Sequence, residues 1–205
     1  MGYNVNIIGF HGTTENNADL ILKDKHFIPT INESHWLGQG VYFFREDVDQ
    51  AMSWAITETK RQQKKRAAVL MAEINVDNRY FLNLNSREHL FKLKSMMKKM
   101  DEDLREINYG LIGEEEAIKN HIYRCAVLDL IPSEVVKVIQ NNFQLEQPKT
   151  LNTLEFKRMD IEMHSIQVCV RDHELIEGEK ISLHSQQEVK SHVRRKRRQT
   201  AQIKY

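Results

Sequence analysis

The sequence predicts an α+β protein, with one domain over residues 1–189 and a basic tail over residues 190–205. Two observations carry this prediction. Short β-prone runs gather near both ends of the chain, and a stretch of helical periodicity at residues 86–146 separates them. There is no internal repeat, and 205 residues are enough to bury a core within a single domain.

The first part of the chain alternates predicted strands and helices. Thr14 can cap a helix because its hydroxyl follows a β-prone run and precedes apolar residues at helical spacing. Two glycines lead into the second β-prone run, which is rich in aromatic residues. In order, we predict a strand at 4–10, a turn at 11–14, a helix capped by Thr14, a loop from Pro29, a strand at 40–44, a helix from Asp47 and a buried central strand at 67–76.

The middle of the chain is predicted to be helical. Its apolar residues first recur three or four positions apart, which predicts one long amphipathic helix over residues 90–107. Helices at 117–130 and 133–140 follow, separated by Pro132. Beyond Pro148 the pattern returns to strands, which we predict at 153–156, 166–171 and 180–183.

The composition excludes several classes of protein. The two cysteines, Cys125 and Cys169, are too few for a disulfide framework or a zinc cage, so we expect buried packing residues and no bound metal. Without a membrane span or a signal-peptide pattern, we expect a cytoplasmic protein with reduced thiols and no membrane contact. Sequence motifs of Rossmann dehydrogenases, Walker-type nucleotidases and zinc proteases are missing as well.

Charge is unevenly distributed along the chain. Residues 190–205 contain seven Lys and Arg residues and no acid, so the tail carries +7. Because the net charge of the chain is +1, the other residues sum to −6. Such a basic cluster can attach an acidic body to nucleic acid, or it can be a solvated terminus, and the two interpretations are compatible.

Three segments place polar residues where a core strand would normally be apolar. They are His11-Gly12-Thr13 at the end of the first strand, Tyr42 within Gly40-Val41-Tyr42-Phe43, and Gln167 within a strand of alternating apolar residues. Taken singly, each has an ordinary structural explanation: a hydrogen-bonding His, a core Tyr and a solvent-facing Gln. Together they point to a site.

The combination resembles the diphtheria-toxin-like, or poly(ADP-ribose) polymerase-like, ADP-ribosyltransferases. In that family a strand ending in His-Gly-Ser/Thr precedes a Gly-x-Gly-Ile/Val-Tyr-Phe segment, and here Tyr42 follows His11 by 31 residues. Trp54 stands where the family carries an aromatic residue that stacks on nicotinamide, and Gln167 stands where it carries a catalytic glutamate. The resemblance covers residues 7–83 and 153–183, and includes stand-alone bacterial and phage-related transferases of toxin–antitoxin or anti-phage type.

The resemblance implies a fold of two small packed β-sheets that form an NAD cleft, with residues 86–146 as a helical insertion. It assigns His11 to the ribose hydroxyls, Thr13 to the nicotinamide carboxamide, and Tyr42 and Trp54 to the two faces of the nicotinamide ring. Backbone N–H and C=O groups at Gly12 can pair with the carboxamide. Cleavage of the nicotinamide–ribose bond passes through an oxocarbenium-like state, which requires an oriented substrate and excluded water.

Gln167 departs from the family pattern. An amide can orient a hydroxyl but cannot accept its proton, so we expect transfer of a single ADP-ribose. A base could then come from the acceptor or from a carboxylate such as Glu155, Glu162 or Glu174, which the sequence does not rank. The same departure leaves open a silent module that binds NAD or ADP-ribose. An RNA 2′-phosphotransferase ranks last, because no basic phosphate ligands accompany His11 or Tyr42.

The acceptor is expected to be RNA, DNA or protein. The basic tail favours nucleic acid slightly, because clustered Lys and Arg bind phosphates without reading sequence. The helical insertion could select the acceptor, seat an antitoxin or other inhibitor, or serve only as a scaffold.

Overall fold

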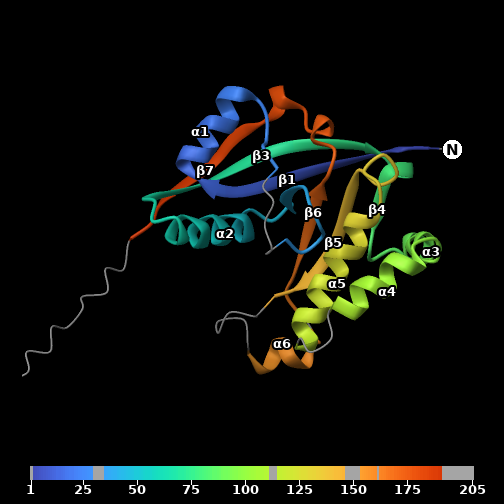
Figure 1. The fold of residues 1–205 in the computed structure, drawn as a ribbon. Helices are drawn as coiled ribbons and strands as arrows, with labels where there is room; N and C mark the ends of the chain where they lie inside the picture. The colour runs from blue at the N-terminus through green and yellow to red at the C-terminus, as the bar shows by residue number, and fades with distance from the viewer. Residues whose placement is uncertain (1, 30–34, 111–114, 146–152, 161, 191–205) are drawn as a thin grey trace, which may run out of the picture.

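The computed structural model describes residues 2–29, 35–110, 115–145, 153–160 and 162–190, and all structural statements below concern these residues. The order of elements is β1 (Asn4–Thr14), α1 (Glu15–Asp24), β2 (Val41–Arg45), α2 (Val48–Arg61), β3 (Arg66–Asp77), η1 (Asn78–Tyr80), β4 (Phe81–Asn83), α3 (Arg87–Met97), α4 (Asp101–Gly110), α5 (Glu116–Leu130), β5 (Val138–Gln144), α6 (Leu154–Arg158), β6 (His164–Val170), η2 (His173–Leu175), η3 (Gly178–Lys180) and β7 (Ser182–Glu188). The protein is therefore α+β, as the sequence predicted (Figure 1).

The strands form one mixed sheet in the order β4-β5-β6-β2-β1-β3-β7. The pair β4–β5 is parallel and every other pair is antiparallel. This differs from the two small packed sheets that the family resemblance implied. The two halves of the sheet, β4-β5-β6-β2 and β1-β3-β7, are joined through the short ladder between β1 and β2 and diverge on either side of it (Figure 1).

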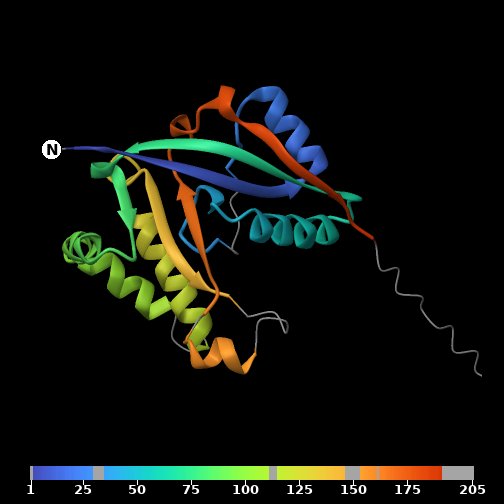
Figure 2. The same ribbon diagram turned by 180° about the vertical axis from the view of Figure 1, so that it is seen from behind.

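Helices cover the two faces of the sheet differently. Helix α1 packs on one face, in the largest apolar cluster, which includes Ala18, Phe27, Phe43 and Leu70. Helices α2 and α5 pack on the opposite face, α2 over β1 and β3 and α5 over the half that contains β5 and β6. Figure 2 shows α1 and α2 on either side of the strands between them.

The two helices near the candidate site, α1 and α2, each begin at a residue whose side chain caps the helix. The Thr14 hydroxyl accepts a hydrogen bond from the N–H of Asn17 at 3.4 Å, so Thr14 caps α1 as predicted. The Asp47 carboxylate accepts one from the N–H of Gln50 at 3.0 Å and caps α2. The predicted turn at residues 11–14 is wrong, because β1 runs on to Thr14 through continuous pairing with β3.

The helical stretch at 86–146 is more broken than predicted. The expected single helix over 90–107 is two helices, α3 and α4, separated at residues 98–100. The expected helix at 133–140 is wrong, because residues 138–144 form β5, which pairs with both β4 and β6. The insertion therefore contributes a strand to the sheet besides its helices.

Two predictions near the C-terminus also change. The predicted strand at 153–156 is wrong, since Leu154–Arg158 is the short helix α6. The strand predicted at 180–183 begins at Ser182 as β7 and is preceded by a 3₁₀ turn.

Of the basic tail 190–205, only Lys190 lies among the described residues. No helix within the described ranges is long and apolar enough to cross a membrane.

Candidate functional site

The ladder between β1 and β2 ends after the pair Phe10–Phe44. Before that pair the strands are hydrogen-bonded, and the N–H of Glu46 donates to the C=O of Ile8 at 3.2 Å. Strand β1 nevertheless continues to Thr14 and remains paired with β3 along that length. Residues 11–14 of β1 and 41–43 of β2 thus face each other without a ladder, and we call this place the β1–β2 opening.

Backbone groups of Gly12 point into this opening. In an antiparallel strand, every second residue directs its N–H and C=O to the same neighbour. Because Ile8 faces β2, Gly12 does too, and continuing the register would make Gly12 and Tyr42 the next hydrogen-bonded pair. The ladder stops before that pair, and the C=O of Tyr42 instead accepts a hydrogen bond from His11 Nδ1 at 2.8 Å.

That hydrogen bond fixes the chemical form of His11. A carbonyl can only accept, so Nδ1 must carry the proton. The ring lies edge-on to Phe27, with 5.1 Å between ring centroids, and near Phe43 at 5.8 Å. Burial lowers the pKa of His11, so the ring is neutral near pH 7 and its Nε2 is a hydrogen-bond acceptor. A neutral His of this kind can accept from a sugar hydroxyl.

The Tyr42 side chain is committed to the segment that precedes β2. Its hydroxyl accepts from the N–H of Leu37 at 2.7 Å and donates to the C=O of Gly38 at 2.6 Å. Its ring lies 4.8 Å from that of His35. Burial raises the pKa of Tyr42, so the phenol stays protonated. Only the ring of Tyr42 therefore remains to contact a ligand.

Tyr42 and Gln167 share a face of the sheet, and His11 lies on the other. The His11 ring contacts Phe43, the neighbour of Tyr42 in β2, and successive strand residues point to opposite faces. Gln167 lies opposite Phe44, two pairs along the β2–β6 ladder from Tyr42–Cys169 and so on the same face. The structure thus places Gln167 on the same face of the sheet as Tyr42, while the His11 side chain lies on the opposite face.

Gly12 is required for a reason that the sequence did not indicate. A Cβ at Gly12 would lie 2.0 Å from the C=O oxygen of Ala51 in α2. The missing side chain therefore lets α2 approach β1 and does not make room for a ligand. The neighbouring Thr13 is buried, and its hydroxyl accepts from Asn17 Nδ2 at 3.4 Å. Thr13 is turned toward the start of α1.

Trp54 lies on α2, the helix that packs over β1 and β3. One flank of α2 carries Met52 and Ile56, which pack on Ala67 and Val189 at the β3 and β7 side. Trp54 is two positions from each of them, roughly 200° around the helix. Trp54 is therefore on the flank of α2 that is turned away from β7. It is 42% exposed, so its ring is accessible.

The structure adds a carboxylate that the sequence did not single out. Asp47 accepts a hydrogen bond from the buried Ser165 hydroxyl at 2.8 Å, and Ser165 lies two residues from Gln167 on the same face of β6. The sequence indicated Asp47 only as a helix start. No local pattern connects it to Ser165, which is 118 positions away.

The three candidate carboxylates named from the sequence lie elsewhere along the fold. Glu155 is in α6, and Glu174 is in η2, beyond the end of β6. Glu162 precedes β6 and lies 3.8 Å from His164.

A second feature missed by the sequence is the contact between α5 and residues 35–39. Three side chains of α5 hydrogen-bond this backbone: Arg124 Nε to the C=O of Trp36 at 2.8 Å, Cys125 Sγ to the C=O of His35 at 2.8 Å, and Asp129 Oδ1 from the N–H of Gln39 at 2.7 Å. Sequence separations near 90 residues conceal these pairs. Part of the predicted loop 29–37, residues 30–34, lies outside the described residues.

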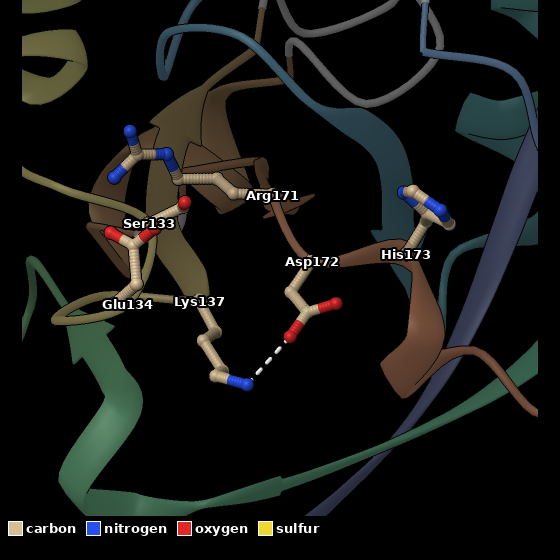
Figure 3. A pocket seen from close by; sticks show the side chains of 6 residues that line it. All are labelled: Ser133, Glu134, Lys137, Arg171, Asp172 and His173. Atoms are coloured by element: carbon tan, nitrogen blue, oxygen red, sulfur yellow. Dashed lines mark hydrogen bonds and ion pairs between the residues drawn. The ribbon is translucent and has the colours of Figure 1, made fainter.

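A cavity of about 190 Å³ opens just beyond the end of β6 (Figure 3). Lys137 crosses it to Asp172 at 2.6 Å, and this ion pair lowers the pKa of Asp172. The remaining lining residues are Ser133, Glu134, Arg171 and His173. Acidic and basic side chains balance here, so the cavity has no clear preference for an anion.

Within the described ranges, no group of three or more His, Cys, Asp and Glu side chains could hold a metal.

Comparison with known proteins finds a distant relative. The chain is 27% identical over 184 residues to an uncharacterized protein of Methanocaldococcus jannaschii, and the match covers 82% of this chain and 83% of the relative. No protein-family model matches the chain, and no solved structure matches it significantly. The relative's name gives no activity or ligand, so function has to be argued from the β1–β2 opening itself.

Proposed function

We propose that the protein is an NAD-dependent mono-ADP-ribosyltransferase whose site is the β1–β2 opening. The observation that carries this proposal is the interrupted ladder at Gly12 and Tyr42, which leaves strand backbone facing a place where neutral His11 also lies. A carboxamide has one acceptor oxygen and an NH₂ donor. The N–H and C=O of Gly12 offer the complementary pair.

The surrounding side chains suit the rest of such a substrate. Neutral His11 can accept a hydrogen bond from a ribose hydroxyl through Nε2. Trp54 and the Tyr42 ring would lie beside the nicotinamide ring and exclude water from it. Gln167 can orient a ribose hydroxyl on the Tyr42 face. These residues bind, orient and desolvate, which is most of what glycosidic cleavage requires from the protein.

The transfer breaks one bond and forms one. The ribose C1′–nitrogen bond breaks and its electron pair leaves with nicotinamide, while a nucleophilic atom of the acceptor bonds to C1′ and gives up a proton. Because Gln167 cannot take that proton, it passes to solvent or to a carboxylate. Without a base at this position, a second ADP-ribose unit would not be activated, so the product is a single unit.

The acceptor is proposed to be nucleic acid, with protein as the alternative. The basic tail supports nucleic acid, since its +7 charge would bind phosphates. The helical region could seat an inhibitor, which would suit a toxin or defence effector held in check by an antitoxin. Labelling that falls steeply with salt and after deletion of residues 190–205 would support the nucleic-acid acceptor, and unchanged labelling would favour protein.

A second candidate is a module that binds NAD or ADP-ribose without turnover. The observation that favours it is the neutral amide at Gln167, where a transferase of the resembled family carries a carboxylate. Such a module would keep the β1–β2 opening for binding. It would neither release nicotinamide nor label an acceptor.

The test incubates the purified chain with adenine-labelled NAD and a cell lysate, and divides the products between protease and nuclease digestion. Trp54→Ala is the informative variant, because the side chain is exposed and its removal should leave the fold intact. Tyr3→Ala, another exposed aromatic residue, serves as the control at the opposite end of β1. Label lost in Trp54→Ala alone supports the transferase. NAD binding without label or free nicotinamide supports the binding module, and no NAD binding rejects both.

A further inference from the structure

The segment 35–39 is the link between the helical region and the proposed site. Its residue Gly38 has φ of +80°, a backbone conformation that residues other than glycine rarely adopt. A Cβ at Gly38 would lie 2.3 Å from Asp129 Oδ1, so the carboxylate of α5 rests directly against this turn. The same oxygen accepts the N–H of Gln39 at 2.7 Å. Asp129 thus contacts two successive residues of the turn.

The other side of the turn holds Tyr42. Both hydrogen bonds of the Tyr42 hydroxyl end on the turn backbone, one from Leu37 N–H at 2.7 Å and one to Gly38 C=O at 2.6 Å. The Asp129 carboxylate and the Tyr42 hydroxyl therefore bind the same peptide group, Asp129 at the Gln39 N–H and Tyr42 at the Gly38 C=O. A shift of this peptide group would change both contacts together, because its C=O and N–H lie in one rigid plane.

We propose that Asp129 is a positioning residue for Tyr42. Its charged hydrogen bond to Gln39 fixes the turn at 37–39, and the turn holds the Tyr42 hydroxyl, and with it the ring, at the edge of the β1–β2 opening. The consequence for NAD rests on the proposed function, but the order of the turn does not. Helix α5 is then part of the site and not only a scaffold beside it.

The residues near Asp129 make its carboxylate suitable for this task. A carboxylate accepts a backbone N–H more strongly than a neutral oxygen does, and the 2.7 Å distance is that of a charge-assisted bond. Arg124 and Cys125 hold the preceding residues from the same helix. Those two hydrogen bonds end on Trp36 and His35, which do not hydrogen-bond Tyr42, whereas the Asp129 hydrogen bond ends on the peptide group that Tyr42 binds.

The first experiment measures amide hydrogen exchange by NMR in the full chain, residue by residue, for the wild type, Asp129→Ala and Asp129→Asn. Alanine removes the acceptor, whereas asparagine keeps an oxygen for Gln39. We expect the Leu37 and Gln39 amides to exchange about tenfold faster or more in Asp129→Ala, and to recover most of their protection in Asp129→Asn. Glu116→Ala, at the other end of α5, is the matched control and should leave them unchanged.

Two results would overturn the positioning role. One is unchanged exchange at Leu37 and Gln39 in Asp129→Ala. The other is faster exchange throughout the protein in both Asp129 variants, which would mean that Asp129 serves only general stability. If Asp129→Ala does not fold, Asp129→Asn decides: its Leu37 and Gln39 amides must exchange faster than in the wild type while the β3 amides do not.

A second measurement connects the turn to the ligand. The dissociation constant for NAD, determined by calorimetry, should rise about tenfold in Asp129→Ala and return toward the wild-type value in Asp129→Asn. A wild-type chain that does not bind NAD would remove the proposed function and leave the exchange result standing. Binding that is equal in all three proteins, combined with loosened amides, would show that the turn does not position Tyr42 for NAD.

Discussion

The Nδ1 atom of His11 donates to the backbone C=O of Tyr42 across the end of the β1–β2 ladder, at 2.8 Å. A side chain here replaces a backbone donor, because the pair that Gly12 and Tyr42 would have formed is not made. The strands can separate at this point without leaving the Tyr42 carbonyl unpaired. This hydrogen bond therefore accounts for the opening and for the proton on His11 Nδ1, while burial keeps the ring neutral by lowering its pKa.

Replacing His11 should weaken the fold locally. In His11→Ala the C=O of Tyr42 loses its donor, and an unpaired carbonyl costs about 1–3 kcal/mol where it is shielded from water. We expect the free energy of unfolding in urea to fall by that amount. His164→Ala, whose side chain makes only a 3.8 Å contact with Glu162, should change it little. If both variants lost the same free energy of unfolding, the hydrogen bond from His11 to Tyr42 would contribute nothing specific to stability.

Stability should also depend on the protonation of His11. Burial lowers the His11 pKa below its ordinary value of 6.5. The unfolded chain therefore takes up the proton more readily, so stability is full above pH 6.5 and is lost as the pH falls below it toward the folded-state pKa. The pKa values of His35 and His89 are lowered by burial too. His11→Ala should reduce this pH dependence without abolishing it, as unfolding free energies measured above and below pH 6.5 would reveal.

Gly12→Ala should be strongly destabilising. The added methyl group would meet the C=O of Ala51 at 2.0 Å, and neither backbone can move without separating α2 from β1. Such overpacking costs about 1–3 kcal/mol, which thermal unfolding would detect. Gly2→Ala is the control, because its Cβ would come no nearer than 3.3 Å to any neighbouring side chain, the nearest being Asp77. A Gly12→Ala protein as stable as Gly2→Ala would contradict the close approach of α2.

The sequence predicted those elements whose signals are local. Thr14 and Asp47 mark their helices because a cap bonds residues only three positions away. Strand β5 was missed although the β-branched Val138 and Ile139 favour a strand, because its pairing with β4 and β6 is not visible in the local sequence. The apolar repeat over residues 90–107 continued across the break between α3 and α4, so it concealed that break.

The candidate site was predictable only in part, for the same reason. His11, Tyr42 and Gln167, which the sequence motifs grouped into one site, lie on three neighbouring strands. The stopped ladder was not predictable, since it depends on register between strands. Asp129 could not be predicted either, because its partner Gln39 is 90 positions away and no motif includes Asp129.

Gln167→Glu separates the two candidate functions. The position is half-buried, opposite Phe44 in β2 and Asn141 in β5, so a carboxylate there would sit on the Tyr42 face without displacing a core side chain. In a transferase, the new base should change the rate of nicotinamide release or lengthen the product, because a carboxylate can accept the proton that an amide cannot. In a silent module, it could start NAD turnover where the wild type has none.

Released nicotinamide and the size of the labelled product are the measurements, with Asn141→Asp as the matched control. Asn141 faces Gln167 across the β5–β6 ladder, so this variant adds the same charge to the same face from the neighbouring strand. A response to Gln167→Glu and not to Asn141→Asp would show that the position of the carboxylate matters, and not merely the charge. If both variants bind NAD as the wild type does and neither alters its turnover, Gln167 does not lie at the reacting bond, and the site must be sought nearer His11.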